Sequence, residues 1–181
     1  LLLPVFCRDF GIKGIWMSVF HSISAFCNAG FDILGTTDHT FVSLTGYSRN
    51  IWLNIVIMLL IITGGIGFLT WEDFYINKFK FKRYRMQSKI ILMTTAILIF
   101  LPAIFFFTND FKMFSGEERT LLSFFQSITT RTAGFNTADY TSLSSSGRGL
   151  TILLMFIGGS PGSTAGGIKT TTAAVLVANA F

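Results

Sequence analysis

Charged side chains are scarce in this chain of 181 residues. They make up 13% of the sequence, whereas average soluble domains carry about 25%. The two cysteines, Cys7 and Cys27, lack metal-ligand spacing, so they fix no redox compartment and predict only apolar packing. The two histidines, His21 and His39, form no ligand cluster with other residues. Because the apolar runs also lack paired carboxylates and a catalytic triad, the sequence argues against an enzyme.

Hydrophobic residues are abundant instead, at 51% of the chain, and 21 of them are phenylalanine. Long apolar runs occur at 51–69 and 90–107, and a third run, from Leu150 to about Ala180, is interrupted by glycines. The first two have the length of a bilayer-spanning helix, about 17 to 25 residues, and Pro102 predicts a kink in the second. The sequence therefore predicts an all-α integral membrane protein. Leu1–Phe6 resembles the tail of another span. With no initiating Met and no signal-peptide pattern, we expect the chain to begin in mid-protein.

One short pattern occurs twice. SISAFCNAGFD at 22–32 aligns with SITTRTAGFN at 127–136 with one residue of slack, and each copy ends an amphipathic run, 14–26 or 117–130. A helix of about 13 residues reaches only ~20 Å, which is too short to cross a hydrocarbon core of ~30 Å. Such a helix must enter the membrane and turn back. The repeat therefore predicts two pore loops, each a half-membrane helix followed by a strip of ion-facing backbone.

The stretch 71–89 is strongly basic. It holds six Lys and Arg residues against Glu72 and Asp73, a net charge of +4. The positive-inside rule places such a cluster in the cytoplasm, so the pore loops would face outward. The same run also fits a solvated anchor at the lipid headgroups. Nucleic-acid binding is disfavoured, because no soluble domain or aromatic platform accompanies the run.

The third apolar run is broken by GGSPGSTAGG at 158–167. Proline lacks a backbone N–H and glycines favour non-helical angles, so the helix should open there, ~12 Å into the bilayer. Irregular backbone at that depth must be buried in protein or line a water-filled cavity. Lys169 follows as an intramembrane functional candidate, or as a side chain that snorkels to the headgroups. GSTAGGIKT resembles a phosphate-binding loop, but Ile168 separates glycine from lysine, so nucleotide binding is not predicted.

Four motifs together resemble the Trk/Ktr/HKT superfamily of potassium transporters, and most of all the bacterial Ktr or Trk membrane subunit. The motifs are SAFCNAGFD at 24–32, ITGGIGF at 62–68, TTRTAGFNTADY at 129–140 and MFIGGSPGSTAGGIKTTT at 155–172. The resemblance implies repeated helix, pore-loop, helix units of the potassium-channel-like type, four of them around one pore. This chain would hold part of the second repeat in 1–70, a cytoplasmic basic loop in 71–89 and the third repeat in 90–181.

The resemblance also implies a function, which is potassium uptake across the plasma membrane by a multi-pass transporter. Potassium would be the only metal ion involved and no cofactor would bind this chain, while coupling to sodium stays open. The expected partners are the lipid bilayer, a second membrane subunit in a homodimer, and a cytoplasmic ring of nucleotide-binding regulatory subunits. The alternative is a membrane structural or regulatory subunit that has pore-loop-like hairpins but conducts nothing.

Potassium enters a narrow filter by exchanging its hydration shell for carbonyl oxygens, which glycine backbones can turn inward. The predicted filter residues are Cys27, Asn28, Ala29, Gly30, Arg131, Thr132, Ala133 and Gly134. In the plant branch of the similar family a serine at the glycine position accompanies sodium transport, so two glycines favour potassium. We expect Arg131 behind the filter, paired with an acid such as Asp139 or Glu117, and Phe31 and Phe135 packed behind the glycines.

The broken helix provides the predicted gate beneath the filter. Small residues would let this segment swing, while Ser160, Ser163, Thr164 and Lys169 make the polar contacts that hold it closed. The predicted gate residues are Gly158, Gly159, Ser160, Pro161, Gly162, Ser163, Thr164, Ala165, Gly166, Gly167 and Lys169.

Overall fold

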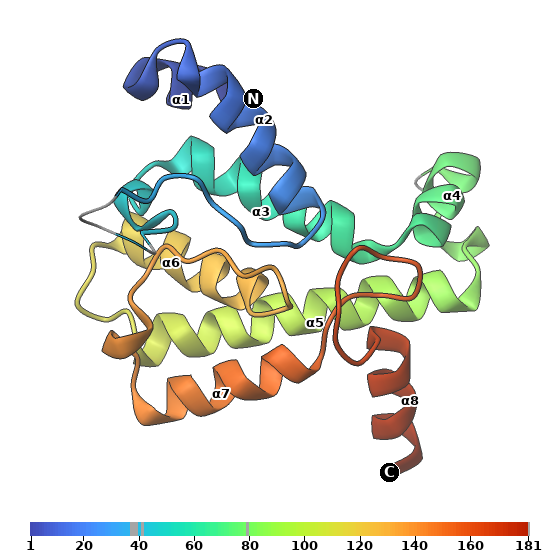
Figure 1. Cartoon of the computed structure of the whole chain (residues 1–181). Helices are drawn as coiled ribbons and strands as arrows, with labels where there is room; N and C mark the ends of the chain where they lie inside the picture. The colour runs from blue at the N-terminus through green and yellow to red at the C-terminus, as the bar shows by residue number, and fades with distance from the viewer. Residues whose placement is uncertain (37–39, 41, 79, 181) are drawn as a thin grey trace.

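The chain folds into helices joined by irregular loops (Figure 1). The computed structural model describes residues 1–36, 40, 42–78 and 80–180, so His39 lies outside the described residues. The helices are α1 (Leu3–Phe10), α2 (Lys13–Phe26), α3 (Ile51–Ile66), α4 (Phe68–Asn77), α5 (Met86–Asn109), α6 (Gly116–Thr129), α7 (Ser145–Phe156) and α8 (Thr170–Ala180), with 3-10 turns η1 (Thr45–Tyr47), η2 (Phe81–Arg83) and η3 (Tyr140–Ser142). Over these residues the prediction of an all-helical chain is confirmed.

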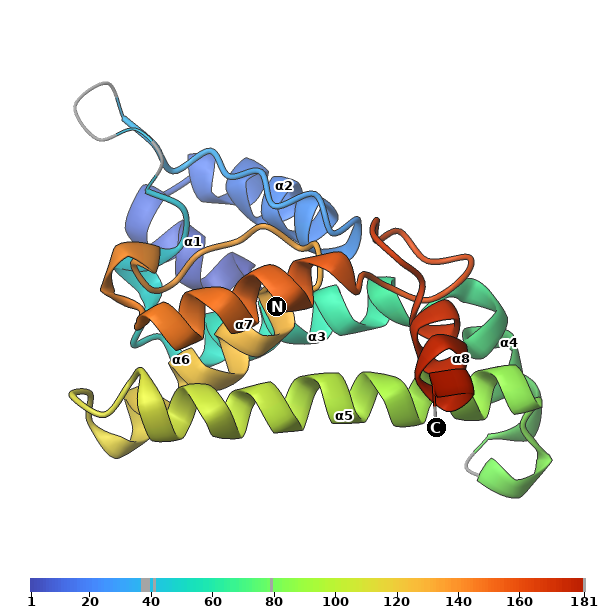
Figure 2. The ribbon, with the colours of Figure 1, turned by 90° about the horizontal axis from the view of Figure 1, so that it is seen from below.

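Helix α5 is the long element along one side of the molecule (Figure 2). Within the described ranges it is the only single helix that is long and apolar enough to cross a membrane. It contains the predicted span at 90–107 and continues without interruption through Pro102. Ile97, Phe100, Leu101 and Ile104 on this helix are each more than half exposed. An apolar surface of this kind suits contact with lipid.

The predicted continuous span at 51–69 is wrong, because α3 ends at Ile66 and α4 turns away from it by 95°. Gly67 has a φ of 93°, and a Cβ atom built on it would lie 2.5 Å from the carbonyl oxygen of Pro161. Backbone from far along the chain thus packs closely against the bend. The Trp71 indole satisfies one carbonyl freed by the bend, donating to Thr63 O at 2.9 Å.

Two clusters of buried apolar residues form the core. The larger joins α1, α2, α3, α5 and α6 and includes Phe6, Ala25, Leu53, Ile57, Ile99, Phe125 and Phe135. The smaller joins α5, α6 and α7 and consists of Phe106, Phe111, Leu122, Leu143 and Leu154. Helix α6 contributes to both clusters, so it is held from both sides. The end of α6 is therefore fixed relative to the end of α2.

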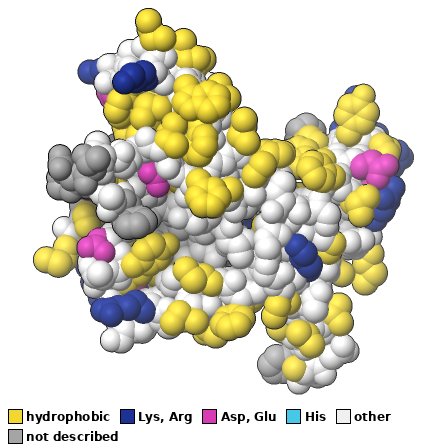
Figure 3. All heavy atoms as spheres, in the orientation of Figure 1, with side chains coloured by type: hydrophobic (Ala, Val, Ile, Leu, Met, Phe, Trp, Pro, Cys, Tyr) yellow, Lys and Arg dark blue, Asp and Glu magenta, His cyan; other side chains and the backbone are white. Residues whose placement is uncertain are grey.

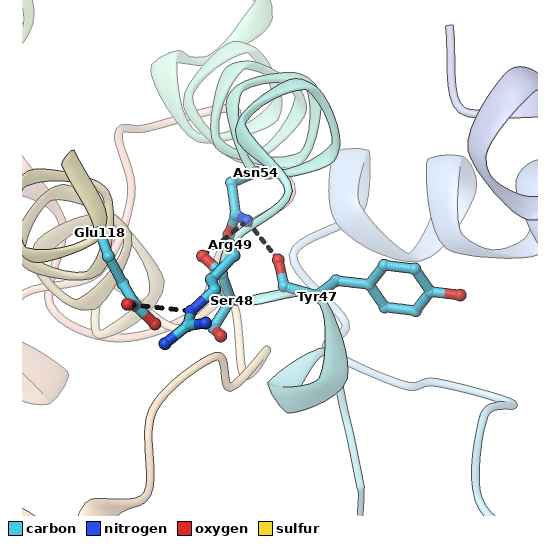
Figure 4. A network of polar contacts seen from close by, with 5 residues as sticks. All are labelled: Tyr47, Ser48, Arg49, Asn54 and Glu118. Atoms are coloured by element: carbon cyan, nitrogen blue, oxygen red, sulfur yellow. Dashed lines mark hydrogen bonds and ion pairs between the residues drawn. The ribbon is translucent and has the colours of Figure 1, made fainter. Parts of the chain in front are cut away.

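Polar contacts tie the start of α3 to the first turn of α6 (Figure 4). Asn54 Nδ2 donates to the Tyr47 carbonyl at 2.7 Å, and Asn50 caps α3 by accepting from the Leu53 amide at 3.0 Å. Arg49 Nε lies 3.1 Å from Glu118 Oε2, with the Arg49 side chain 84% exposed. An ion pair so exposed contributes about 1 kcal/mol or less. The pairing sets orientation more than stability.

The basic stretch 71–89 is a structured corner rather than a plain loop, because α4 and η2 lie within or across it. Buried Asp73 accepts from Ser88 Oγ at 2.6 Å and from the Arg85 amide at 3.1 Å. The Ser88 hydrogen bond, the Arg85 amide and the Arg85 charge together lower the pKa of Asp73 below its ordinary value. Asp73 thereby joins α4 to the start of α5.

Candidate functional site

Helices α2 and α6 end in the same local structure. At the end of α2, Ser24 Oγ donates to the Phe31 carbonyl at 2.8 Å; at the end of α6, Thr129 Oγ1 donates to the Phe135 carbonyl at 2.6 Å. Each bond folds the following strip of backbone back over the last helical turn. Ser24 and Thr129 hold aligned positions of the repeat, directly after the shared Ser-Ile pair. The sequence analysis missed these two hydroxyls, although their alignment was a usable signal.

The backbone conformations after the two helices also correspond. Asn28 and Thr132, which align, have left-handed φ angles of 51° and 63°. Gly30 and Gly134, which also align, have φ angles of 71° and 88°. Left-handed conformations cost residues other than glycine about 1 to 2 kcal/mol each. The same pair of unusual angles at the same two positions in both copies indicates a shared structural requirement.

The two loops touch at their glycines. A Cβ atom built on Gly30 would collide with the carbonyl oxygen of Ala133 and lie 2.6 Å from Gly134 Cα. A Cβ atom built on Gly134 would lie 3.2 Å from Gly30 Cα. Figures 1 and 2 show the strips that follow α2 and α6 running side by side. Segments about a hundred residues apart are thereby brought together, with peptide groups rather than side chains at the contact.

The residues flanking this contact differ between the copies. Phe135 is fully buried, and its ring centroid lies 6.3 Å from that of His21, as expected for a residue packed behind a glycine. Phe31 is 70% exposed, so the expectation that it packs likewise is wrong for this structure. A hollow beside the glycines is lined by residues that include Phe31, Asp32 and Asn136. Asp32 brings a carboxylate to that hollow, which suits a cation.

Arg131 is buried beside the second loop, with 7% of its surface exposed. Among the described residues it forms no ion pair within 4.0 Å, and its Nε has no hydrogen-bond partner. The expected pairing with Asp139 or Glu117 is therefore not found. Asp139 instead caps η3, accepting from the Thr141 amide at 2.8 Å, and Glu117 lies in the exposed first turn of α6. That Arg131 lies behind the filter stays a prediction.

The segment 158–167 separates α7 from α8 and is not helical, as predicted. Gly158 N donates to the Ile168 carbonyl at 3.0 Å and Ile168 N to the Phe156 carbonyl at 2.9 Å, which closes the base of a loop. Helix α7 begins at Ser145 rather than near 149, because Ser144 Oγ caps it by accepting from the Gly147 amide at 3.0 Å. Helix α8 then runs across the direction of α7 (Figure 1).

The closed loop is docked on the bend between α3 and α4. Ser160 N donates to the Gly65 carbonyl at 2.9 Å, Thr164 N to the Gly64 carbonyl at 3.3 Å, and Phe68 N to the Gly162 carbonyl at 3.1 Å. Lys169 Nζ donates to the Ala165 carbonyl at 2.7 Å, so its ammonium group returns to the loop. The loop amides thereby satisfy two carbonyls, those of Gly64 and Gly65, that the last turn of α3 leaves unpaired.

The structure thus has apolar helices with much of their apolar surface exposed (Figure 3) and irregular backbone held between them. These features define a helical protein in which one described helix, α5, is long and apolar enough to cross a membrane. The chain belongs to the TrkH family of cation transport proteins, whose family model matches residues 6–107 and 86–180.

Several known proteins are similar to this chain. The potassium/sodium uptake protein NtpJ of Enterococcus hirae is 44% identical over 97% of this chain and 39% of its own length. The Ktr system potassium uptake protein B of Bacillus subtilis is 36% identical over 91% of this chain and 37% of its own length. The crystal structure of the potassium transporter TrkH from Vibrio parahaemolyticus shares the fold, with a TM-score of 0.71 and 18% identity over 97% of this chain and 37% of that one. The chain therefore spans less than half of each relative, and these relatives are transporters by name, not enzymes.

Proposed function

We propose that this chain forms part of the pore of a potassium-uptake transporter, with Gly30 and Gly134 in the ion filter. The observation that carries the proposal is the contact between these two glycines, at aligned positions and with left-handed backbones. Family membership and the names of the relatives support cation uptake as the activity. The assigned filter strips are residues 27–30 and 131–134.

In the proposed mechanism, potassium sheds water and is coordinated by carbonyl oxygens of the two strips. Helices α2 and α6 end at these strips, so the partial negative charge of each helix C-terminus favours a cation nearby. Hydrogen bonds from Ser24 and Thr129 to the Phe31 and Phe135 carbonyls hold each strip in place. A pre-formed strip spares the ion the cost of ordering the backbone.

The loop 158–167 is proposed as the gate beneath the filter. Its glycines permit more than one backbone conformation, and hydrogen bonds between backbone groups hold it on the bend after α3. In this account Ser160, Thr164 and Lys169 stabilise the closed arrangement, and Lys169 does so through Ala165. Ions pass when the loop leaves its docking site on α3.

The larger assembly follows from the same proposal. Residues 1–70 and 90–181 would belong to two successive repeats, and 71–89 would face the cytoplasm, which places the filter strips outward. We further propose a plasma-membrane homodimer on a cytoplasmic nucleotide-binding ring, with no ligand of that ring bound to this chain. The two relatives' names differ on sodium, since one is a potassium/sodium and the other a potassium uptake protein.

Expression of the full-length protein in cells that lack potassium uptake tests the proposal. The cells should regain growth at low external potassium and accumulate potassium faster than cells with an empty vector. If a correctly inserted full-length protein gives no uptake, the transport proposal fails and a non-conducting membrane subunit becomes the better account. Membrane insertion is checked separately by fractionation and protease protection.

A further inference from the structure

The loop 158–167 reaches the end of α2 through one side chain, Thr164. Its Oγ1 donates to the Phe26 carbonyl at 2.8 Å and accepts from Asn28 Nδ2 at 2.9 Å. Phe26 is the last residue of α2, and Asn28 is the first left-handed residue after it. One hydroxyl group therefore links a helix terminus, a filter strip and the loop beneath them.

The glycine at 64 makes this approach possible. A Cβ atom built on Gly64 would collide with the Phe26 carbonyl oxygen and lie 2.9 Å from Thr164 Oγ1. The Thr164 amide also donates to the Gly64 carbonyl at 3.3 Å. The Thr164 amide is thus bonded to α3, and the Thr164 hydroxyl is bonded to the end of α2. A side chain at position 64 would fill the space between these two helices.

Other contacts of the loop are of a different kind. Its remaining bonds to α3 and α4 are between backbone groups. The Ser160 hydroxyl bonds only to Thr170, at the start of α8, and the Lys169 ammonium bonds only to the Ala165 carbonyl. Among the described residues, the bonds of Thr164 are the only side-chain hydrogen bonds that join the loop to residues that precede it in the chain. A substitution at this position can therefore remove the link without altering the loop backbone.

We propose that Thr164 is a positioning residue that couples the loop 158–167 to the first filter strip. This inference rests on the proposed function. When the loop leaves its site, the Phe26 carbonyl loses one donor and the Asn28 side-chain amide loses its acceptor, and each bond is worth about fivefold in the equilibrium constant. Asn28 directly precedes Ala29 and Gly30, so displacement of the loop releases the strip as well.

The transport test compares Thr164→Val with Thr164→Ser in the full-length protein. Valine keeps the shape but loses the hydroxyl, so the maximal potassium flux should rise several-fold, and KM for potassium should rise too because the strip loosens. Serine keeps the hydroxyl and should restore both parameters. Thr108→Val is the matched control: Thr108 is exposed, and its hydroxyl bonds only within its own helix, to the Ile104 and Phe105 carbonyls and to Asn109 Nδ2. A Thr164→Val protein with unchanged maximal flux and KM overturns the proposal.

A second readout does not need transport. In a Ser163→Cys background, a thiol reagent should modify position 163 about tenfold faster when Thr164→Val is added, because the side-chain oxygen at 163 is buried in the docked loop. Mass spectrometry of the peptide avoids removing Cys7 and Cys27. If Thr164→Val does not fold, Asn28→Asp serves instead: aspartate tolerates the left-handed backbone but cannot donate to Thr164. Equal labelling rates in folded proteins overturn the coupling, whereas absent uptake with faster labelling overturns only the transport proposal.

Discussion

Replacing Gly30 by alanine tests the contact between the two strips directly. The added methyl group would collide with the Ala133 carbonyl oxygen and lie 2.6 Å from Gly134 Cα. Both neighbours are backbone atoms, so no side-chain rotation can relieve the clash. Gly30 also has a φ of 71°, which costs alanine about 1 to 2 kcal/mol. With about 1 to 3 kcal/mol for overpacking, the free energy of unfolding should fall by roughly 2 to 5 kcal/mol.

Alanine at two other glycines, Gly134 and Gly149, separates the contributions to this loss of stability. At Gly134 the nearest atom is Gly30 Cα at 3.2 Å, so alanine there should cost mainly the left-handed backbone strain, about 1 to 2 kcal/mol. Gly149 lies within α7 with open space around it, and alanine there should stabilise the helix by about 0.5 to 1 kcal/mol. Gly149→Ala is therefore the matched control for the chemical change.

The assay is thermal unfolding of the purified full-length protein together with the ratio of potassium to sodium permeability. We expect stability in the order Gly149→Ala, Gly134→Ala, Gly30→Ala, and a lowered permeability ratio in the last two. If Gly30→Ala matches Gly149→Ala in both measurements, the strips do not meet at Gly30 and the reasoning is refuted.

Four other substitutions or deletions test separate parts of the account. Deleting 158–167 should raise potassium flux in a correctly inserted protein, and unchanged flux would rule out the gate. Gly134→Ser should lower the potassium to sodium permeability ratio, whereas an unaltered ratio would mean that Gly134 does not face the ion. Thr129→Val removes the bond to the Phe135 carbonyl and should lower the free energy of unfolding by about 1 kcal/mol, measured by thermal unfolding. The pKa of Asp73 is lowered, so its contribution to the free energy of unfolding is complete above the ordinary pKa of 3.8 and is lost as the pH falls through the lower folded pKa. The Asp73→Asn protein should therefore lose less stability than the unaltered protein over that acidic range, measured by unfolding at a series of pH values. If both proteins lose the same stability there, Ser88 and Arg85 do not act on Asp73.

The helices next to the strips could be predicted closely from the sequence. Runs at 14–26 and 117–130 became α2 and α6 within one residue, because amphipathic spacing and an acidic first turn are local signals. The break at 158–167 was likewise visible, since proline and glycine act on their own backbone. Alignment of the two copies also predicted that Gly30 and Gly134 are equivalent, and they share the same backbone region.

What the sequence could not predict depends on contacts between distant residues. Hydropathy predicted one span at 51–69, but the chain bends by 95° at Gly67, where the Pro161 carbonyl packs against it. Charge counting offered acids for Arg131, yet Asp139 is engaged by the Thr141 amide. The link from Thr164 to Asn28 joins residues 136 positions apart, and no local pattern marks it. Such contacts depend on the three-dimensional arrangement of the backbone, so a local sequence pattern does not predict them.

The central claim is that this chain helps to form a potassium-selective pore, and ion flux through the reconstituted full-length protein tests it most directly. Purified protein in liposomes should carry potassium down its gradient faster than sodium, and Gly134→Ser should narrow that difference. Equal potassium and sodium flux in the unaltered protein, or no flux above that of empty liposomes, would contradict the claim.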